Sequence, residues 1–66
     1  MGNRIPRTAS KLKVTSLTDS SMAKAGTEVI ANKTDRGWIC DYNGQSWFMF
    51  LDHLRNENYN KVEVLA

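Results

Sequence analysis

The Asn43-Gly44 pair is the feature that most constrains how this chain folds. It lies in the middle of the stretch WICDYNGQSWFMF, residues 38–50. A two-residue type I′ turn needs positive φ angles at both central positions, and Asn followed by Gly adopts them most readily. The stretch is therefore predicted to form an antiparallel hairpin. Counting outward from the turn predicts three facing pairs, which are Tyr42 with Gln45, Cys40 with Trp47, and Trp38 with Met49.

Both faces of this hairpin carry large apolar side chains, although a short sheet needs only one buried face. Side chains alternate across a strand, so Ile39, Phe48 and Phe50 share one face. We predict that this face is the interior and that the more aromatic second face lies outward; the reverse assignment also fits the alternation. A surplus apolar face of this kind marks a partner surface or an oligomer interface. The second face carries Trp38, Tyr42 and Trp47, beside Cys40, Met49 and Leu51.

Three further segments are rich in β-branched residues or alternate between apolar and polar positions. They are residues 11–17, 27–33 and 61–66, and each is predicted to be a strand. Residues 52–60 are polar and predict no more than a short helical turn. Residues 1–10 contain Pro6 and show no periodicity, which predicts a flexible arm. The expected organisation is thus an arm over 1–10 followed by an all-β domain of five strands over 11–66.

The size of the chain and its few soft ligands argue against an enzyme or a metal centre. Sixty-six residues bury only a small core, so shallow grooves are expected in place of a deep catalytic cleft. Cys40 and His53 are the only cysteine and histidine, which leaves no disulfide and no paired spacing for zinc. We expect no cofactor and no catalysis. With no signal peptide and no apolar run long enough to span a membrane, the expected location is the cytoplasm.

The cations are concentrated at the start of the chain. Residues 1–13 carry four of them and no acid, whereas the remainder carries five cations against seven acids. A basic arm on a mildly acidic body is not the usual charge distribution of a nucleic-acid-binding barrel, whose body is itself basic. The arm alone offers phosphate contacts at Arg4, Arg7, Lys11 and Lys13.

The stretches AGTEVIANKTDRGWICDYNGQSWFMF and YNKVEVL resemble the SH3-like small barrel, and the resemblance covers residues 11–65. That family has a long first loop, a Gly-Trp opening the third strand, a tight distal turn and a closing Tyr before an alternating Val strand. The resemblance implies a five-stranded SH3-like barrel with binding positions at Trp38, Asp19 and Tyr59. The aromatics of the family's first-strand motif are missing here, where the chain reads SLTDS.

Together these observations predict a non-catalytic binding module, in the manner of the small regulators or inhibitors that bacteria and their phages encode. The expected partner is a protein, since Trp and Tyr are enriched at binding hot spots. A nucleic-acid-binding barrel that uses the arm and stacked aromatics is one alternative, and a homodimer that buries the second face is another. The candidate partner-binding residues are Trp38, Tyr42, Trp47, Asp19 and Tyr59.

Overall fold

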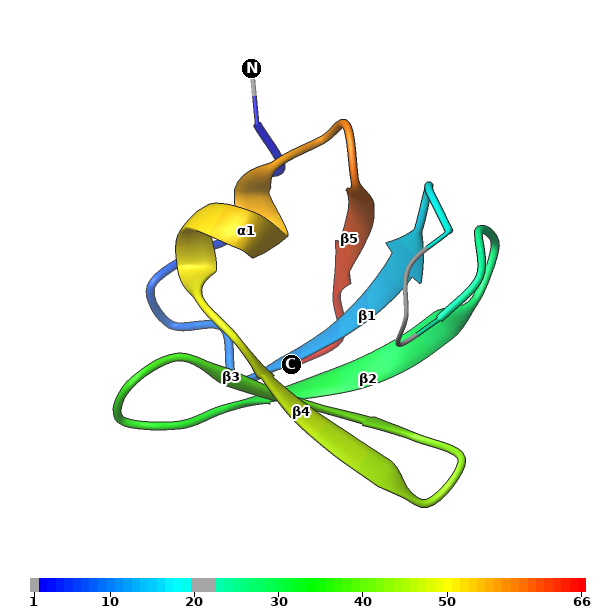
Figure 1. Cartoon of the computed structure of the whole chain (residues 1–66). Helices are drawn as coiled ribbons and strands as arrows, with labels where there is room; N and C mark the ends of the chain where they lie inside the picture. Colours follow the sequence, from blue (N-terminus) through cyan, green and yellow to red (C-terminus); the bar gives the residue numbers. More distant parts are fainter. Residues whose placement is uncertain (1, 20–22) are drawn as a thin grey trace.

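The computed structural model describes residues 2–19 and 23–66, which form one antiparallel sheet and a short helix (Figure 1). The predicted all-β class, with five strands and one short helical segment, is confirmed. The strands are β1 (Lys11–Ser16), β2 (Glu28–Lys33), β3 (Trp38–Tyr42), β4 (Gln45–Met49) and β5 (Asn60–Val64), and α1 (Leu51–Arg55) is the helix.

The sheet is curled but remains open. Its strand order is β4-β3-β2-β1-β5, so four strands follow one another as hairpins and the fifth returns beside the first. The chain passes from one edge of the sheet to the other through α1, which lies over the concave side (Figure 1). Within the described residues β4 pairs only with β3 and β5 only with β1. The closed barrel expected from the sequence is therefore replaced by an open sheet with two edges.

The hairpin of β3 and β4 forms with the predicted register. Asn43 and Gly44 have φ angles of 50° and 80°, as a type I′ turn requires. Tyr42 faces Gln45, and the other two predicted pairs also face each other. Local turn chemistry is thus sufficient to fix this part of the structure.

The predicted interior face of the hairpin is wrong. Trp38 is 3% exposed and Cys40 is fully buried, whereas Phe48 is 39% exposed and Phe50 is 67% exposed. The reason lies in the neighbouring strand, because Ala31 of β2 is the cross-strand partner of Cys40 and directly paired residues share a face. Both are fully buried, so Trp38 and Cys40 join the core. The other core residues are Ile5, Ala9, Leu12, Val14, Val29, Ala31 and Leu54.

Residues 2–10 lie against the sheet and α1 and do not extend away as the predicted arm would. The Asn3 side-chain amide donates hydrogen bonds to the carbonyl oxygens of Leu54 (3.0 Å) and Asn60 (2.7 Å). Ile5 and Ala9 are 7% and 3% exposed and belong to the core cluster. The segment therefore packs as part of the same folded unit as β1–β5.

Single-tryptophan variants test the face assignment. Trp47→Phe leaves only Trp38, which the fold buries, and Trp38→Phe leaves only Trp47, which is partly exposed. Iodide quenching at low protein concentration should be several-fold weaker for Trp38 than for Trp47, because iodide does not enter a packed core. Equal quenching, or stronger quenching of Trp38, would contradict this assignment.

An Ile5→Ala variant tests the packing of residues 2–10. It should lower the free energy of unfolding by about 2 kcal/mol or more, because it removes a buried side chain and leaves a cavity. Urea denaturation followed by circular dichroism would measure the change. Leu65→Ala is the matched control, since Leu65 is 45% exposed, and it should stay within about 0.5 kcal/mol of the wild type. A wild-type stability for Ile5→Ala would mean that the segment does not pack.

Candidate groove

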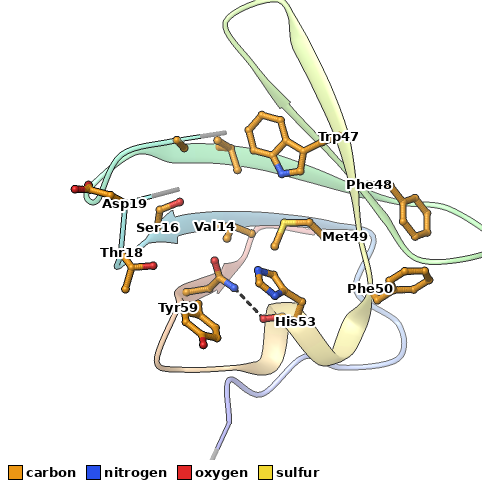
Figure 2. A pocket seen from close by; sticks show the side chains of 13 residues that line it. Val14, Ser16, Thr18, Asp19, Trp47, Phe48, Met49, Phe50, His53 and Tyr59 are labelled. Carbon is orange, nitrogen blue, oxygen red and sulfur yellow. Dashed lines mark hydrogen bonds between the residues drawn. The ribbon is translucent and has the colours of Figure 1, made fainter. Parts of the chain in front are cut away.

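The open side of the sheet forms a groove of about 570 Å³. It lies on the concave face, between the end of β1 with the loop that follows it and the wall made by β4 and α1 (Figure 2). The absence of β4–β5 pairing among the described residues leaves this side accessible. Its apolar lining includes Val14, Val29, Trp47 and Met49.

Trp47 and Met49 form the β4 wall of the groove. Both point to the concave face, because they alternate with the outward-facing Ser46 and Phe48, and both pack against the core from partly exposed positions. The thiol of Cys40 donates a contact of 3.2 Å to the sulfur of Met49. A Met side chain is unbranched and polarizable and adapts to irregular shapes. This wall is therefore suited to contact an apolar side chain of a ligand.

His53 and Tyr59 form a second wall. Their rings stack with centroids 5.7 Å apart and an interplanar angle of 11°, while Tyr59 remains 47% exposed. The backbone beneath them is held by Asn60, which is 4% exposed and donates from its side chain to the carbonyl oxygen of His53 at 2.9 Å. The N–H groups of Tyr59 and Asn60 also donate to the carbonyl oxygen of Asn56. These hydrogen bonds hold the α1–β5 connection in place and thereby position the His53 and Tyr59 rings.

Asp19 lies at the end of the groove farthest from Phe48 and Phe50 (Figure 2). One of its carboxylate oxygens accepts a hydrogen bond from the backbone N–H of Ala25 at 2.9 Å, which ties the two sides of the first loop together. An ionised carboxylate has two acceptor oxygens, so the same side chain can bind a ligand cation as well. Asp19 therefore gives the groove an acidic end.

The structure separates the predicted partner-binding residues into three groups. Asp19, Trp47 and Tyr59 line the groove together. Trp38 is 3% exposed in the core, which leaves its side chain almost no surface to offer a partner. Tyr42 is 40% exposed beside the hairpin turn and is not part of the groove lining.

Met49 and His53 are among the groove residues that the sequence did not predict. Met49 was assigned to the outward face together with Trp38, and His53 was considered only as a possible metal ligand. Their roles depend on the burial of Trp38 and on the turn that stacks His53 against Tyr59. No spacing motif in the sequence indicates that stacking.

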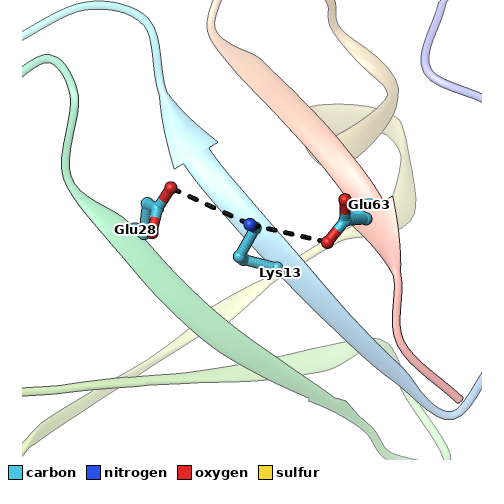
Figure 3. Close-up of polar contacts among 3 residues, drawn as sticks. All are labelled: Lys13, Glu28 and Glu63. Carbon is cyan, nitrogen blue, oxygen red and sulfur yellow. Dashed lines mark ion pairs between the residues drawn. The ribbon is translucent and has the colours of Figure 1, made fainter.

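The predicted phosphate-binding cations do not stand in a purely basic environment. Lys13 lies between two carboxylates, 3.9 Å from Glu28 and 3.5 Å from Glu63 (Figure 3). Arg4, Arg7 and Lys11 are exposed. Surface pairs of this kind contribute little to stability, but they place acidic groups where a phosphate would approach. The charge distribution around Lys13 does not favour a nucleic acid.

The chemistry of Cys40 is that of a buried thiol. Burial raises its pKa from 9.0 to about 11, and the negative charge of Asp41 adds to the effect. At neutral pH it is therefore protonated, whereas nucleophilic and metal-binding cysteines act as thiolates. No group of three or more His, Cys, Asp or Glu side chains in residues 2–19 and 23–66 is arranged to hold a metal ion.

Comparison of the chain with protein-family models, with curated proteins and with solved structures gives no match. Among the described segments, no helix has the length and apolar character needed to cross a membrane.

The pKa of Cys40 predicts a loss of stability at high pH. Below pH 9 the thiol is protonated in the folded and the unfolded chain, so it causes no pH dependence. Between pH 9 and about 11 the unfolded chain releases the proton and the folded chain keeps it, so the free energy of unfolding falls as pH rises. The slope is at most about 1.4 kcal/mol per pH unit.

Urea denaturation of the wild type and of Cys40→Ala at a series of pH values measures this effect. Effects of pH that the two proteins share cancel in the difference between their free energies of unfolding. Above pH 9 the free energy of unfolding should fall more for the wild type than for Cys40→Ala. A difference that stays constant up to pH 11 would show that the Cys40 pKa is not raised by folding.

Proposed function

We propose that this chain is a non-catalytic binding module, related to SH3-like domains, whose groove takes up an extended segment of a partner protein. The observation that carries the proposal is the groove itself, where Trp47 and Met49 face Tyr59 and His53 across an apolar floor. Aromatic side chains around a shallow apolar depression are typical of peptide-binding surfaces. The strand number, the long first loop and the short helix before β5 support the relation to SH3-like domains.

The groove indicates the chemistry of the segment that it would bind. Its apolar floor suits one large apolar side chain of the partner, and the carboxylate of Asp19 at one end suits a neighbouring Lys or Arg. The groove is too open to enclose a small molecule on all sides. An extended peptide, in contrast, could lie between its two walls. A small chain that binds one segment of another protein would act as a regulator or inhibitor of that protein.

The nucleic-acid alternative has less support. A single-strand-binding barrel places stacking aromatics beside cations that bind the phosphates. The groove aromatics here lie beside Asp19, and Lys13 is flanked by two glutamates. The alternative of a homodimer that buries the second face has less support as well, because Trp38 of that face is 3% exposed and lies in the core.

Two tyrosines of similar exposure provide a matched test of the groove. Tyr59 lines it and is 47% exposed, and Tyr42 lies outside it and is 40% exposed. Peptides selected from a phage-displayed random library against the wild-type protein should bind Tyr59→Ala about tenfold more weakly or worse, because an aromatic hot spot is lost. Fluorescence anisotropy with labelled peptides would measure the affinities.

Tyr42→Ala should bind the same peptides within about twofold of the wild type, because its side chain is not part of the groove. Asp19→Asn keeps an acceptor for the Ala25 N–H and removes the charge, so it should weaken basic peptides and leave neutral ones unaffected. A library that yields no binder would contradict the proposal. Binders that are indifferent to Tyr59→Ala would contradict it as well.

A further inference from the structure

The outer edge of β4 offers backbone hydrogen-bonding groups that no described strand uses. Tyr42 and Gln45 face each other across a two-residue turn. Residues that flank such a turn form a hydrogen-bonded pair, so Gln45 directs its N–H and C=O toward β3. Bonding directions alternate along a strand, and Ser46 and Phe48 therefore direct theirs to the open edge. Sheet edges of this kind are the usual sites of strand addition.

β4 is also the only strand of the sheet without a charged residue. It reads QSWFM, while the other edge strand, β5, reads NKVEV and carries Lys61 and Glu63. Natural proteins place charges on edge strands to prevent pairing between molecules. A charge on a strand that pairs with its own copy also introduces two charges of the same sign at close range. The β4 edge has neither obstacle.

On the convex face of this edge, side-chain size increases along the strand. An antiparallel second copy would therefore place small side chains opposite large ones. Gly44 and Ser46 are small, and Phe48 and Phe50 are large. The two Phe rings contact each other edge to face at 4.9 Å and are exposed. Phe48 is held in place against Gly37, where a Cβ atom would lie only 2.6 Å from its ring. Phe48, packed against Gly37, and the exposed Phe50 thus stand beside two small residues, Gly44 and Ser46.

We propose that β4 pairs with β4 of a second copy in an antiparallel arrangement centred on Trp47. Ser46 of each copy then faces Phe48 of the other, and Gly44 faces Phe50, so small residues oppose large ones on the convex face. This register also lets Ser46 and Phe48 exchange hydrogen bonds across the interface, which uses all the outward backbone groups of both strands. Centring the pair on Phe48 would oppose identical rings and leave Ser46 of each copy without a partner inside β4.

The dimer does not require the proposed peptide binding, although both surfaces use Trp47, and Phe48 and Phe50 also line the groove. The pairing rests on the backbone edge of β4, whereas Tyr59, His53 and Asp19 line the groove from other parts of the chain. Peptide binding that fails while the dimer forms would count against the groove alone. A monomeric protein that still binds peptide would count against the edge pairing alone.

Sedimentation equilibrium over a range of concentrations tests the pairing, together with the variant Ser46→Lys. The wild type should approach twice the 7.5 kDa of one chain, with a dissociation constant on the order of 10–100 µM for so small an interface. Ser46→Lys should weaken the dimer at least about tenfold, because a long side chain replaces a small one opposite Phe48 and two cations come close on the same face. Val64→Lys adds the same charge to the β5 edge and should dimerise like the wild type.

A mixture of ¹³C-labelled and unlabelled protein tests the register without any substitution. The α-protons of the two Trp47 residues should give an intermolecular NOE, because residues that face each other in a pair without hydrogen bonds bring their α-carbons closest. A wild type that stays monomeric at about 1 mM would overturn the proposal. So would a dimer that lacks this NOE, or one that a folded Ser46→Lys variant leaves intact.

Discussion

The pairing of Ala31 with Cys40 is the contact on which the rest of this structure depends. It joins the face of β2 that carries Val29 and Ala31 to the face of β3 that carries Cys40 and Trp38. Because a shift of one residue moves every side chain to the other face, this one register decides which half of the hairpin is buried. Trp47 and Met49 then pack against the core as they line the groove, and Phe48 and Phe50 keep exposed rings at its border.

The sheet is open because its two edge strands do not meet. After β4 the chain passes through α1, and β5 pairs with β1 at the edge opposite β4. Leu54 of α1 and Ile5 of the N-terminal segment complete the core, so residues outside the strands supply part of it. The concave face therefore has a covered part, which is the core, and an uncovered part, which is the groove.

The sequence was sufficient for features that depend on neighbours along the chain. The Asn43-Gly44 turn and the register of its hairpin needed only the φ preferences of two residues. The buried face could not be predicted in the same way, because both faces of the hairpin are apolar and the choice depends on Ala31 in another strand. The packing of Ile5 depends on contacts with distant elements, and residues 1–10 have no periodicity that would indicate it. The stacking of His53 on Tyr59 is likewise a result of the α1–β5 connection.

The two proposed surfaces meet at Trp47, Phe48 and Phe50, which line the groove and flank the pairing edge. Trp47 forms part of the groove wall on the concave face and is also the centre of the proposed pairing along the β4 edge. A two-fold axis at Trp47 would bring the grooves of both copies next to each other on the same side of a continuous sheet. Two adjacent sites convert the second binding step into an intramolecular one, so a partner with two suitable segments would be bound far more tightly than a partner with one. A weak dimer and a shallow groove would each contribute little affinity alone. Together they would make the binding of a partner selective and dependent on protein concentration.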